Sequence, residues 1–355
     1  MIGQESLLSP FTFDPDQVLP PERVYYEGFL TEGDLVVWLG REKHRKTNLI
    51  LQFAICASLG RDFLGFRFLA EQPLKIVVFD YESKSHSLKR RYEAICSAMG
   101  LNEDERRRLK ENLRIVEIRK MLKSGEAFPH LPVKVTNREE KREERMAESF
   151  WRSLVKSNPA DIYILDPMRS VHAQDENDSN IEQLLSAFRK MFKNAAVIVA
   201  HHMRKRGNNS NSTISLKENM RIWSDDARGS TAIKAHADTI VCQERVIESH
   251  AEVLYWGAFL KDDADIEPVA LEESDAQSFF WQVVPDVPDV LRTTYDALRA
   301  AGGQFADRAT AVHTAVKAGV ARATAYRHMK DLANRGILVE QGGRWELAAE
   351  VSIPR

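Results

Sequence analysis

The chain has 355 residues, a length that suggests about two domains. Its hydrophobic content of 43% and charged content of 29% are those of a folded globular protein and argue against a disordered chain. The formal net charge is only −2, so the chain as a whole is not a polycation and any surface that binds nucleic acid must be local.

Residues 1–23 predict an extended N-terminal arm that lacks an apolar signal segment. No apolar run in the chain reaches about 18 residues. We therefore expect a cytoplasmic protein with no membrane partner. Three cysteines without metal-ligand spacing fit reduced, buried thiols; they are Cys56, Cys96 and Cys242.

Short apolar runs alternate with helical patterns through the next part of the chain. Strands are predicted at 33–40, 75–79, 161–165 and 195–200. Helices are predicted at 47–59, 87–99 and 181–192, and the charge-dense stretches 106–108 and 138–145 predict solvated helices and a connecting loop. This alternation predicts an α/β fold with a mostly parallel sheet flanked by helices.

The pattern changes after the fourth strand. Residues 203–224 are polar and without periodicity, which predicts a long functional or mobile loop. Residues 239–243 and 251–260 alternate like antiparallel edge strands, and 279–284 predicts another. Pro285 and Pro288 then mark a linker over residues 285–291. We expect one domain over residues 24–284.

A phosphate-binding loop is predicted after the first strand. Gly40, Lys46 and Thr47 stand at P-loop spacing, in which backbone N–H groups wrap phosphates, the lysine reaches the β/γ-phosphates and the hydroxyl holds Mg²⁺. Arg45 replaces the second glycine and can donate its N–H if its φ/ψ is ordinary and its side chain points outward. The alternative is a basic surface turn. The predicted ATP-binding residues are Gly40, Lys43, His44, Arg45, Lys46, Thr47 and Asn48.

Acidic residues follow the next two strands along the chain. Asp80 and Glu82 end the second strand, and Asp166 ends the third after an apolar run. Carboxylates at the carboxyl edge of parallel strands face the ligand crevice. Asp166 has the Walker B arrangement, which predicts a Mg²⁺ site formed with Thr47. The alternative for each acid alone is a solvated strand end.

These motifs, in this order, resemble the RecA-like ATPases close to the hexameric RepA replicative helicase group. The resemblance covers about residues 24–284 and rests on 40–47, 79–82, 164–168 with 175–178, and 199–205 with 227–232. It implies a RecA-like fold that binds ATP and Mg²⁺. It also implies a homo-oligomer in the form of a ring, such as a hexamer.

The resemblance also implies roles for single residues. Lys46 would bind phosphates, Glu82 would polarise the attacking water, and His201 or His202 would sense the γ-phosphate. Arg228 would act on a neighbour's nucleotide as an arginine finger. Core packing is the alternative for the histidines, and a structural arginine for Arg228. Lys261 stands where related ring helicases carry Lys-x-Arg, but Asp263 replaces the arginine.

Residues 292–355 predict a second, smaller domain. Helices are expected at 293–301, 306–318 and 321–335, followed by a hairpin at 337–347 that turns at Gly342 and Gly343. Basic residues outnumber acidic ones here, as phosphate binding requires. The pattern resembles winged helix-turn-helix domains, which implies DNA binding, with protein contacts as the alternative. His328 is predicted to reach the groove with the candidate DNA-binding residues Arg322, Thr324, Tyr326, Arg327, Lys330 and Arg344.

Two functions remain open on the sequence. The first is an ATP-dependent DNA motor or replication-initiation ATPase, in which Arg204, Lys205 and Arg206 of the 203–222 loop line a DNA path. The second is a DNA-binding switch that binds ATP with little hydrolysis. Glu82 favours the motor, whereas Arg45 and Asp263 favour the switch.

Overall fold

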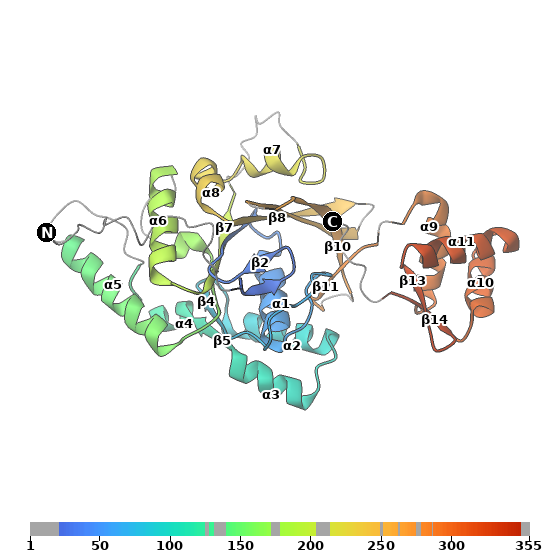
Figure 1. The fold of residues 1–355 in the computed structure, drawn as a ribbon, viewed down its shortest axis with the longest axis horizontal. Helices are drawn as coiled ribbons and strands as arrows, with labels where there is room; N and C mark the ends of the chain where they lie inside the picture. Colours follow the sequence, from blue (N-terminus) through green and yellow to red (C-terminus); the bar gives the residue numbers. More distant parts are fainter. Residues whose placement is uncertain are drawn as a thin grey trace, which may run out of the picture.

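Parallel strands run from one edge of a nine-stranded sheet past its middle in the large N-terminal unit (Figure 1). This computed structural model describes residues 21–124, 128–130, 140–171, 178–203, 214–248, 251–261, 263–274, 278–285 and 287–348. In spatial order the parallel strands are β5 (Leu113–Glu117), β4 (Ile76–Asp80), β6 (Ile162–Asp166), β7 (Ala196–His202), β3 (Leu35–Gly40) and β8 (Thr239–Glu248). The sheet continues antiparallel through β9 (Ala251–Leu260), β10 (Ile266–Glu273) and β11 (Trp281–Val283). The predicted mostly parallel α/β class is confirmed.

Successive residues of β3 enter two hydrophobic cores, one on each face of the sheet. Val36 and Trp38 belong to the first core and Val37 and Leu39 to the second. The first core is covered by α1 (Lys46–Leu59), α2 (Ser85–Ala98) and α3 (Glu103–Asn112). The second is covered by α4 (Ile118–Lys123), α5 (Glu140–Ser157), α6 (Asp178–Met191), α7 (Met220–Ser224) and α8 (Ser230–His236). Since both faces are covered, β3 reads in the sequence as one continuous apolar run.

The structure corrects three predictions in the second half of this unit. Residues 239–243 are predicted as an edge strand, but β8 lies between β3 and β9, pairs parallel with β3, and extends to Glu248. Residues 251–260 are also predicted as an edge strand, but β9, although antiparallel to its neighbours, lies between β8 and β10. The segment 203–224 is predicted as a loop, yet its last residues form α7, whose Trp223 is buried. A helix of little more than one turn is too short to show helical periodicity in the sequence.

Several short elements were not predicted from the sequence. They are β1 (Val24–Tyr26), β2 (Leu30–Thr31), the 3-10 helix η2 (Met168–Ser170), β5, β10, α4 and α8. Most of them lie at sheet edges or chain crossings, where tertiary contacts rather than local periodicity decide the conformation. In the part of the chain that the structure describes, none of the helices is both long and apolar enough to cross a bilayer.

A small C-terminal unit has a hydrophobic core of its own (Figure 1). It contains α9 (Asp289–Ala300), α10 (Arg308–Lys317), α11 (Arg322–Asn334) and a three-stranded sheet of β12 (Gln304–Phe305), β14 (Arg344–Leu347) and β13 (Leu338–Gln341). Helix α9 begins inside the segment predicted as a linker, and the Val287 side chain already lies in the core of the small unit. An ion pair between Arg299 of α9 and Glu272 of β10 links the two units.

Candidate nucleotide-binding site

The carboxyl ends of β3, β4, β6 and β7 meet at one edge of the sheet. The register places Gly40 opposite His202 and Asp80 opposite Asp166. Ligands of open α/β sheets bind outside this edge, at the carboxyl ends of the strands. Segments that lie far apart in the sequence therefore supply one site, with the candidate residues Gly40, Lys46, Thr47, Glu82, Asp166, His201 and His202.

Lys46 is buried at the start of α1. Its Nζ donates to the backbone oxygens of Gly40 at 2.6 Å and Arg41 at 3.0 Å, and lies 3.1 Å from Nδ1 of His202. Burial lowers the pKa of Lys46 to about 8, although the carboxylate of Asp166 opposes that shift. The ammonium thus sits beside the N-terminus of α1, whose free N–H groups favour an anion such as phosphate.

Arg45 adopts a backbone conformation that differs from the expected one. Its φ is +65°, in the left-handed region, so the condition of an ordinary φ/ψ is not met at this arginine. The position keeps the conformation that the glycine of the P-loop pattern favours, although it carries a Cβ. The side chain leads away from the loop to Glu252 of β9, with Nε–Oε1 and Nη2–Oε2 distances of 2.8 and 3.2 Å.

The other predicted loop residues face different surroundings. Lys43 is exposed and also has a positive φ of 63°. The ring of His44 faces β8, where its Nδ1 accepts from the backbone N–H of Arg245 at 3.0 Å. Burial and the nearby charge of Lys46 lower the pKa of His44 to about 4, so the ring is neutral near pH 7. Asn48 is buried in the first turn of α1.

Thr47 and Asp166 form the candidate metal site. The Thr47 hydroxyl hydrogen-bonds the Asp166 carboxylate, and burial raises the pKa of that carboxyl to about 6. A carboxylate oxygen next to a hydroxyl oxygen fits Mg²⁺, which takes few protein ligands and completes its shell with phosphates and water. No cluster of three metal-ligating side chains occurs among the described residues, and a nucleotide-bound Mg²⁺ does not need one.

Glu82 lies beside the same edge, exposed to solvent. Its Oε1 is 3.9 Å from Nε2 of His202, and the contact with His202 lowers the pKa of Glu82. The other ring nitrogen of His202, Nδ1, faces the Lys46 ammonium, which can only donate. In a neutral His202 the proton therefore sits on Nε2, where it faces Glu82.

The two adjacent histidines have different surroundings. His201 is fully buried, and its Nε2 lies 2.9 Å from the Arg228 backbone oxygen. Because a carbonyl only accepts, Nε2 carries the proton, and burial lowers the pKa of His201 to about 4. His202 rather than His201 thus faces the Lys46 and Glu82 side chains. The Arg228 side chain is exposed, in the turn before α8.

The residues that support the loop from outside were not predicted from the sequence. Gln243 of β8 donates to the His44 carbonyl and accepts from Trp38 at 2.8 Å. Arg41 forms an ion pair of 2.9 Å with Asp226, two residues before Arg228. These contacts join segments about 200 residues apart, and no local pattern marks them.

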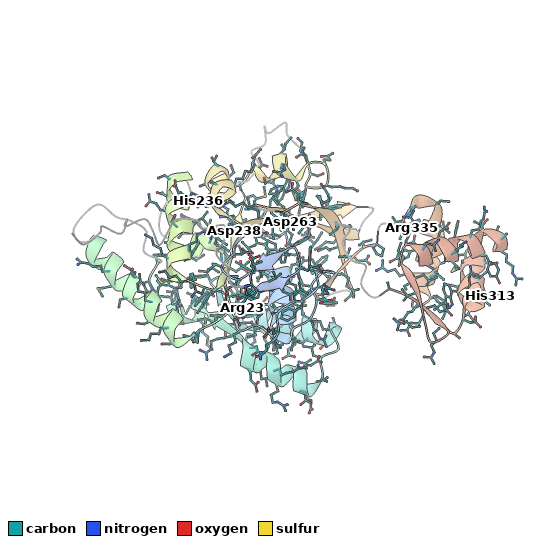
Figure 2. All side chains as sticks on the ribbon, viewed as in Figure 1. Arg23, His236, Asp238, Asp263, His313 and Arg335 are labelled. Carbon is teal, nitrogen blue, oxygen red and sulfur yellow. The ribbon has the colours of Figure 1, made fainter. Side chains whose placement is uncertain are left out.

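Lys261 lies far from the phosphate loop. It follows β9, and its backbone N–H donates to the backbone oxygen of Asp238. Asp238 in turn donates to Leu35, the first residue of β3, whereas the phosphate loop follows the last residue of that strand. Asp238, Lys261 and Asp263 line one hollow at this opposite edge. Figure 2 labels Asp238 and Asp263. Within one chain, position 263 therefore lies away from the predicted nucleotide site.

Most of the candidate DNA-binding residues of the small unit are on its surface. Arg322, Arg327, Lys330 and Arg344 are exposed, Tyr326 is 38% exposed, and Thr324 is half-buried. The prediction for His328 is wrong, because its side chain is buried and its Nδ1 lies 2.6 Å from the Thr294 hydroxyl of α9. Arg204, Lys205 and Arg206 lie outside the described residues.

Comparison with known proteins identifies the large unit. A family model described as an AAA domain matches residues 5–208, more than half of the chain. The crystal structure of a KaiC-like protein from the hyperthermophilic archaeon Pyrococcus horikoshii OT3 aligns with a TM-score of 0.46 and 13% identity, over 74% of this chain and 94% of that one. No curated protein matches the chain. The chain therefore belongs to the AAA domain family, and its large unit is a P-loop ATPase domain of mostly parallel α/β fold.

Proposed function

We propose that this protein is an ATP-dependent DNA-binding motor that works as an oligomer, of the kind that initiates replication or unwinds DNA. One observation carries the ATPase part of the proposal. A phosphate-binding lysine, a Thr47–Asp166 pair and a Glu82–His202 pair converge on one edge of the sheet. These are the groups that positioning and charge stabilisation of a phosphoryl transfer require.

Each group has a separate part in the proposed hydrolysis. Mg²⁺–ATP would supply the scissile phosphoanhydride bond and the metal charge. Lys46 would bind phosphate oxygens, and Thr47 and Asp166 would hold the metal. Glu82 would accept a proton from the attacking water. His202 would direct its Nε2–H toward that carboxylate, 3.9 Å away, while its Nδ1 faces the lysine on the other side of the ring.

The small unit supports a role in DNA binding. Residues 292–348 carry nine Lys and Arg against five Asp and Glu, although the whole chain has a net charge of −2. Helix α11 exposes Arg327 and Lys330 on the side opposite its buried Met329 and Leu332. The Arg308 guanidinium lies 5.6 Å from the Tyr326 ring and 5.5 Å from the Trp345 ring, which joins α11 to the β13–β14 hairpin. We propose a winged helix whose third helix enters the major groove.

The oligomer part of the proposal rests on Arg228. The backbone of this residue is fixed to the site through the His201 contact, while its side chain is exposed. An arginine placed at the rim of one nucleotide site is suited to reach the site of a neighbouring subunit in a ring.

An ATP-binding switch with little hydrolysis is the second candidate. The observation that favours it is the phosphate loop, where Lys43 and Arg45 hold positive φ values without glycine. Steady-state hydrolysis of Mg²⁺–ATP, measured with and without duplex DNA, separates the two functions.

We expect the parental protein to hydrolyse ATP and DNA to stimulate it. Glu82→Gln should bind ATP but lose about 10²–10⁴-fold in rate, because an amide cannot accept the proton. Lys46→Ala should lose ATP binding. Glu71→Gln, at an exposed position between α1 and β4, is the matched control and should behave as the parent. ATP binding with no more turnover than Glu82→Gln, even with DNA, would reject the motor in favour of the switch.

A further inference from the structure

Two positions of the phosphate loop adopt left-handed backbone conformations without being glycine. Lys43 has a φ of 63° and Arg45 a φ of 65°. A Cβ disfavours this region, which is why the P-loop pattern has glycine at the second of these positions. Something outside the loop must therefore stabilise the arginine in the conformation that glycine adopts readily.

The side chain of Arg45 is held by a carboxylate of the β8–β9 hairpin. Glu252 accepts from Nε and Nη2 of Arg45 at 2.8 and 3.2 Å, and a second arginine, Arg245, binds the same carboxylate at 2.7 Å. Such two-point contacts between guanidinium and carboxylate are directional as well as strong. Glu252 side-chain exposure is 24% and that of Arg45 is 36%, so solvent screens the pair only partly.

The preceding residue of the loop is bound to the same hairpin. The His44 carbonyl accepts from the Gln243 side chain, and its ring Nδ1 accepts from the backbone N–H of Arg245 at 3.0 Å. Residues 44 and 45 are thus attached to β8 and β9 through both backbone and side chains. Burial raises the pKa of Glu252, but the two arginines lower it by more. The net pKa is below its ordinary value, so the carboxylate is ionised near pH 7.

We propose that Glu252 is a positioning residue of the nucleotide site. Its carboxylate and the guanidinium groups of Arg45 and Arg245 together form a clamp. The clamp holds the phosphate loop open for ATP in the conformation that a glycine would adopt without help. Glu252 neutralises the Arg45 guanidinium. Arg45 therefore contributes to ATP binding through the loop conformation that the clamp stabilises, and not through its charge. The proposal rests on the proposed nucleotide site and assigns the device that shapes it.

A glycine-rescue experiment tests the clamp in the full-length protein. ATP affinity is measured for the parent, Glu252→Ala, Arg45→Gly and the double variant. Glu252→Ala should weaken ATP binding about tenfold, because Arg45 loses the contact that holds its conformation. In the Arg45→Gly background the same Glu252→Ala change should cost less than about twofold, so the double variant should bind ATP as Arg45→Gly alone does, since glycine needs no clamp.

Lys43→Gly is the matched control, because it also puts glycine at a left-handed position of the same loop. It should not rescue Glu252→Ala, which should still cost about tenfold in that background. A merely structural role of Glu252 in the hairpin predicts the same loss in every background. An equal loss in the parental and the Arg45→Gly backgrounds, or no loss at all, would overturn the proposal.

A second readout separates the clamp from the nucleotide site. Urea unfolding of the same variants without ATP should show that Glu252→Ala lowers the midpoint more with Arg45 present than with Arg45→Gly. If the parental protein binds no ATP, the proposed function fails while this coupling still tests the clamp. Equal midpoint shifts in both backgrounds would reject the clamp whatever the ATP affinity.

Discussion

Asp166 shows how a candidate metal-binding position can oppose stability. It is buried at the end of β6, and burial raises its pKa to about 6 from an ordinary value near 3.8. Two pKa units correspond to about 3 kcal/mol of preference for the protonated carboxyl, an upper figure for a group that also has a hydrogen bond. The folded protein therefore keeps an ionised carboxylate at neutral pH at a cost, which a bound Mg²⁺ would offset.

We predict that Asp166→Asn stabilises the ligand-free protein by roughly 1–3 kcal/mol at pH 7 and abolishes Mg²⁺-dependent hydrolysis. Asparagine keeps an oxygen that can accept from Thr47 but carries no charge. The sign follows from the raised pKa: the folded state loses stability as pH rises from about 4 through about 6. Urea unfolding of both proteins should thus show the full difference at pH 7 and almost none at pH 4. A parent that is more stable than the variant at pH 7 would contradict the assigned cost.

Helix α11 illustrates how one element serves a core and a surface. Ala325, Met329 and Leu332 are buried against α9 and α10, whereas Arg327 and Lys330 project to solvent. Helical spacing alone separates these two faces. His328 is the exception, since the Thr294 hydroxyl of α9 holds a ring that sequence reasoning expects in a DNA groove.

We predict different effects for two exposed residues of α11 on duplex binding. Arg327→Ala should cost about 1–3 kcal/mol on the preferred sequence and relax the preference if it reads a base edge. Lys330→Ala should weaken all sequences alike and reduce the salt dependence, as loss of a phosphate contact does. Fluorescence anisotropy with specific and random duplexes at several salt concentrations measures both.

Arg335→Ala is the charge-matched control for these variants. Arg335 lies at the end of α11 in a hollow with Asp331 and the start of α9, on the side of the small unit nearer the large unit (Figure 2). Its loss should change affinity less than the loss of Arg327 or Lys330. If all three variants bind every duplex as the parent does, α11 is not the DNA-binding helix.

At the scale of the whole molecule, the two units have separate hydrophobic cores. The core of the small unit runs from Val287 to Leu338 and includes no residue of the large sheet. An ion pair between Arg299 and Glu272 connects the two units. An ion pair that solvent reaches contributes little to stability, so the small unit should not depend on it.

We predict that a fragment of residues 285–355 folds by itself and binds duplex DNA with steep salt dependence. It begins before Val287 because that side chain is part of the core. Residues 1–284 should keep ATP binding and lose duplex preference. Circular dichroism and anisotropy report folding and binding of each piece. A folded fragment without DNA affinity at low salt would assign the small unit to protein contacts.

We also predict that Arg228 acts across a subunit boundary. Arg228→Ala and Glu82→Gln should each be inactive alone, but their mixture should regain part of the parental ATPase rate. In mixed oligomers some sites would combine an intact Glu82 with an Arg228 from the neighbour. Arg228→Ala mixed with the double variant Glu82→Gln/Arg228→Ala is the control and should stay inactive. No recovery in the first mixture, despite subunit exchange shown by light scattering, would place Arg228 in its own site or outside catalysis.

The sequence by itself determined the α/β class, the central strands and the phosphate loop. Strands such as β3 are buried on both faces and therefore appear as apolar runs, and the Gly40-to-Thr47 spacing is a local pattern. It also pointed to Asp166 and Glu82, because acids at strand ends are readable without knowing which strands are neighbours. The order of the strands in the sheet is known only from the structure. That order is what brings these acids together at one edge.

Only the tertiary structure decided which residues complete the site. Of the two histidines, only His202 faces the candidate site. The alternation of side chains along β7 directs the His202 ring toward Lys46 and the His201 ring toward the Arg228 backbone. The tertiary structure also placed β8 inside the sheet and brought Glu252 to Arg45 across 207 residues of chain. Such contacts depend on strand register and hairpin position, which are set by burial and pairing over the whole sheet and leave no periodic signal in the sequence.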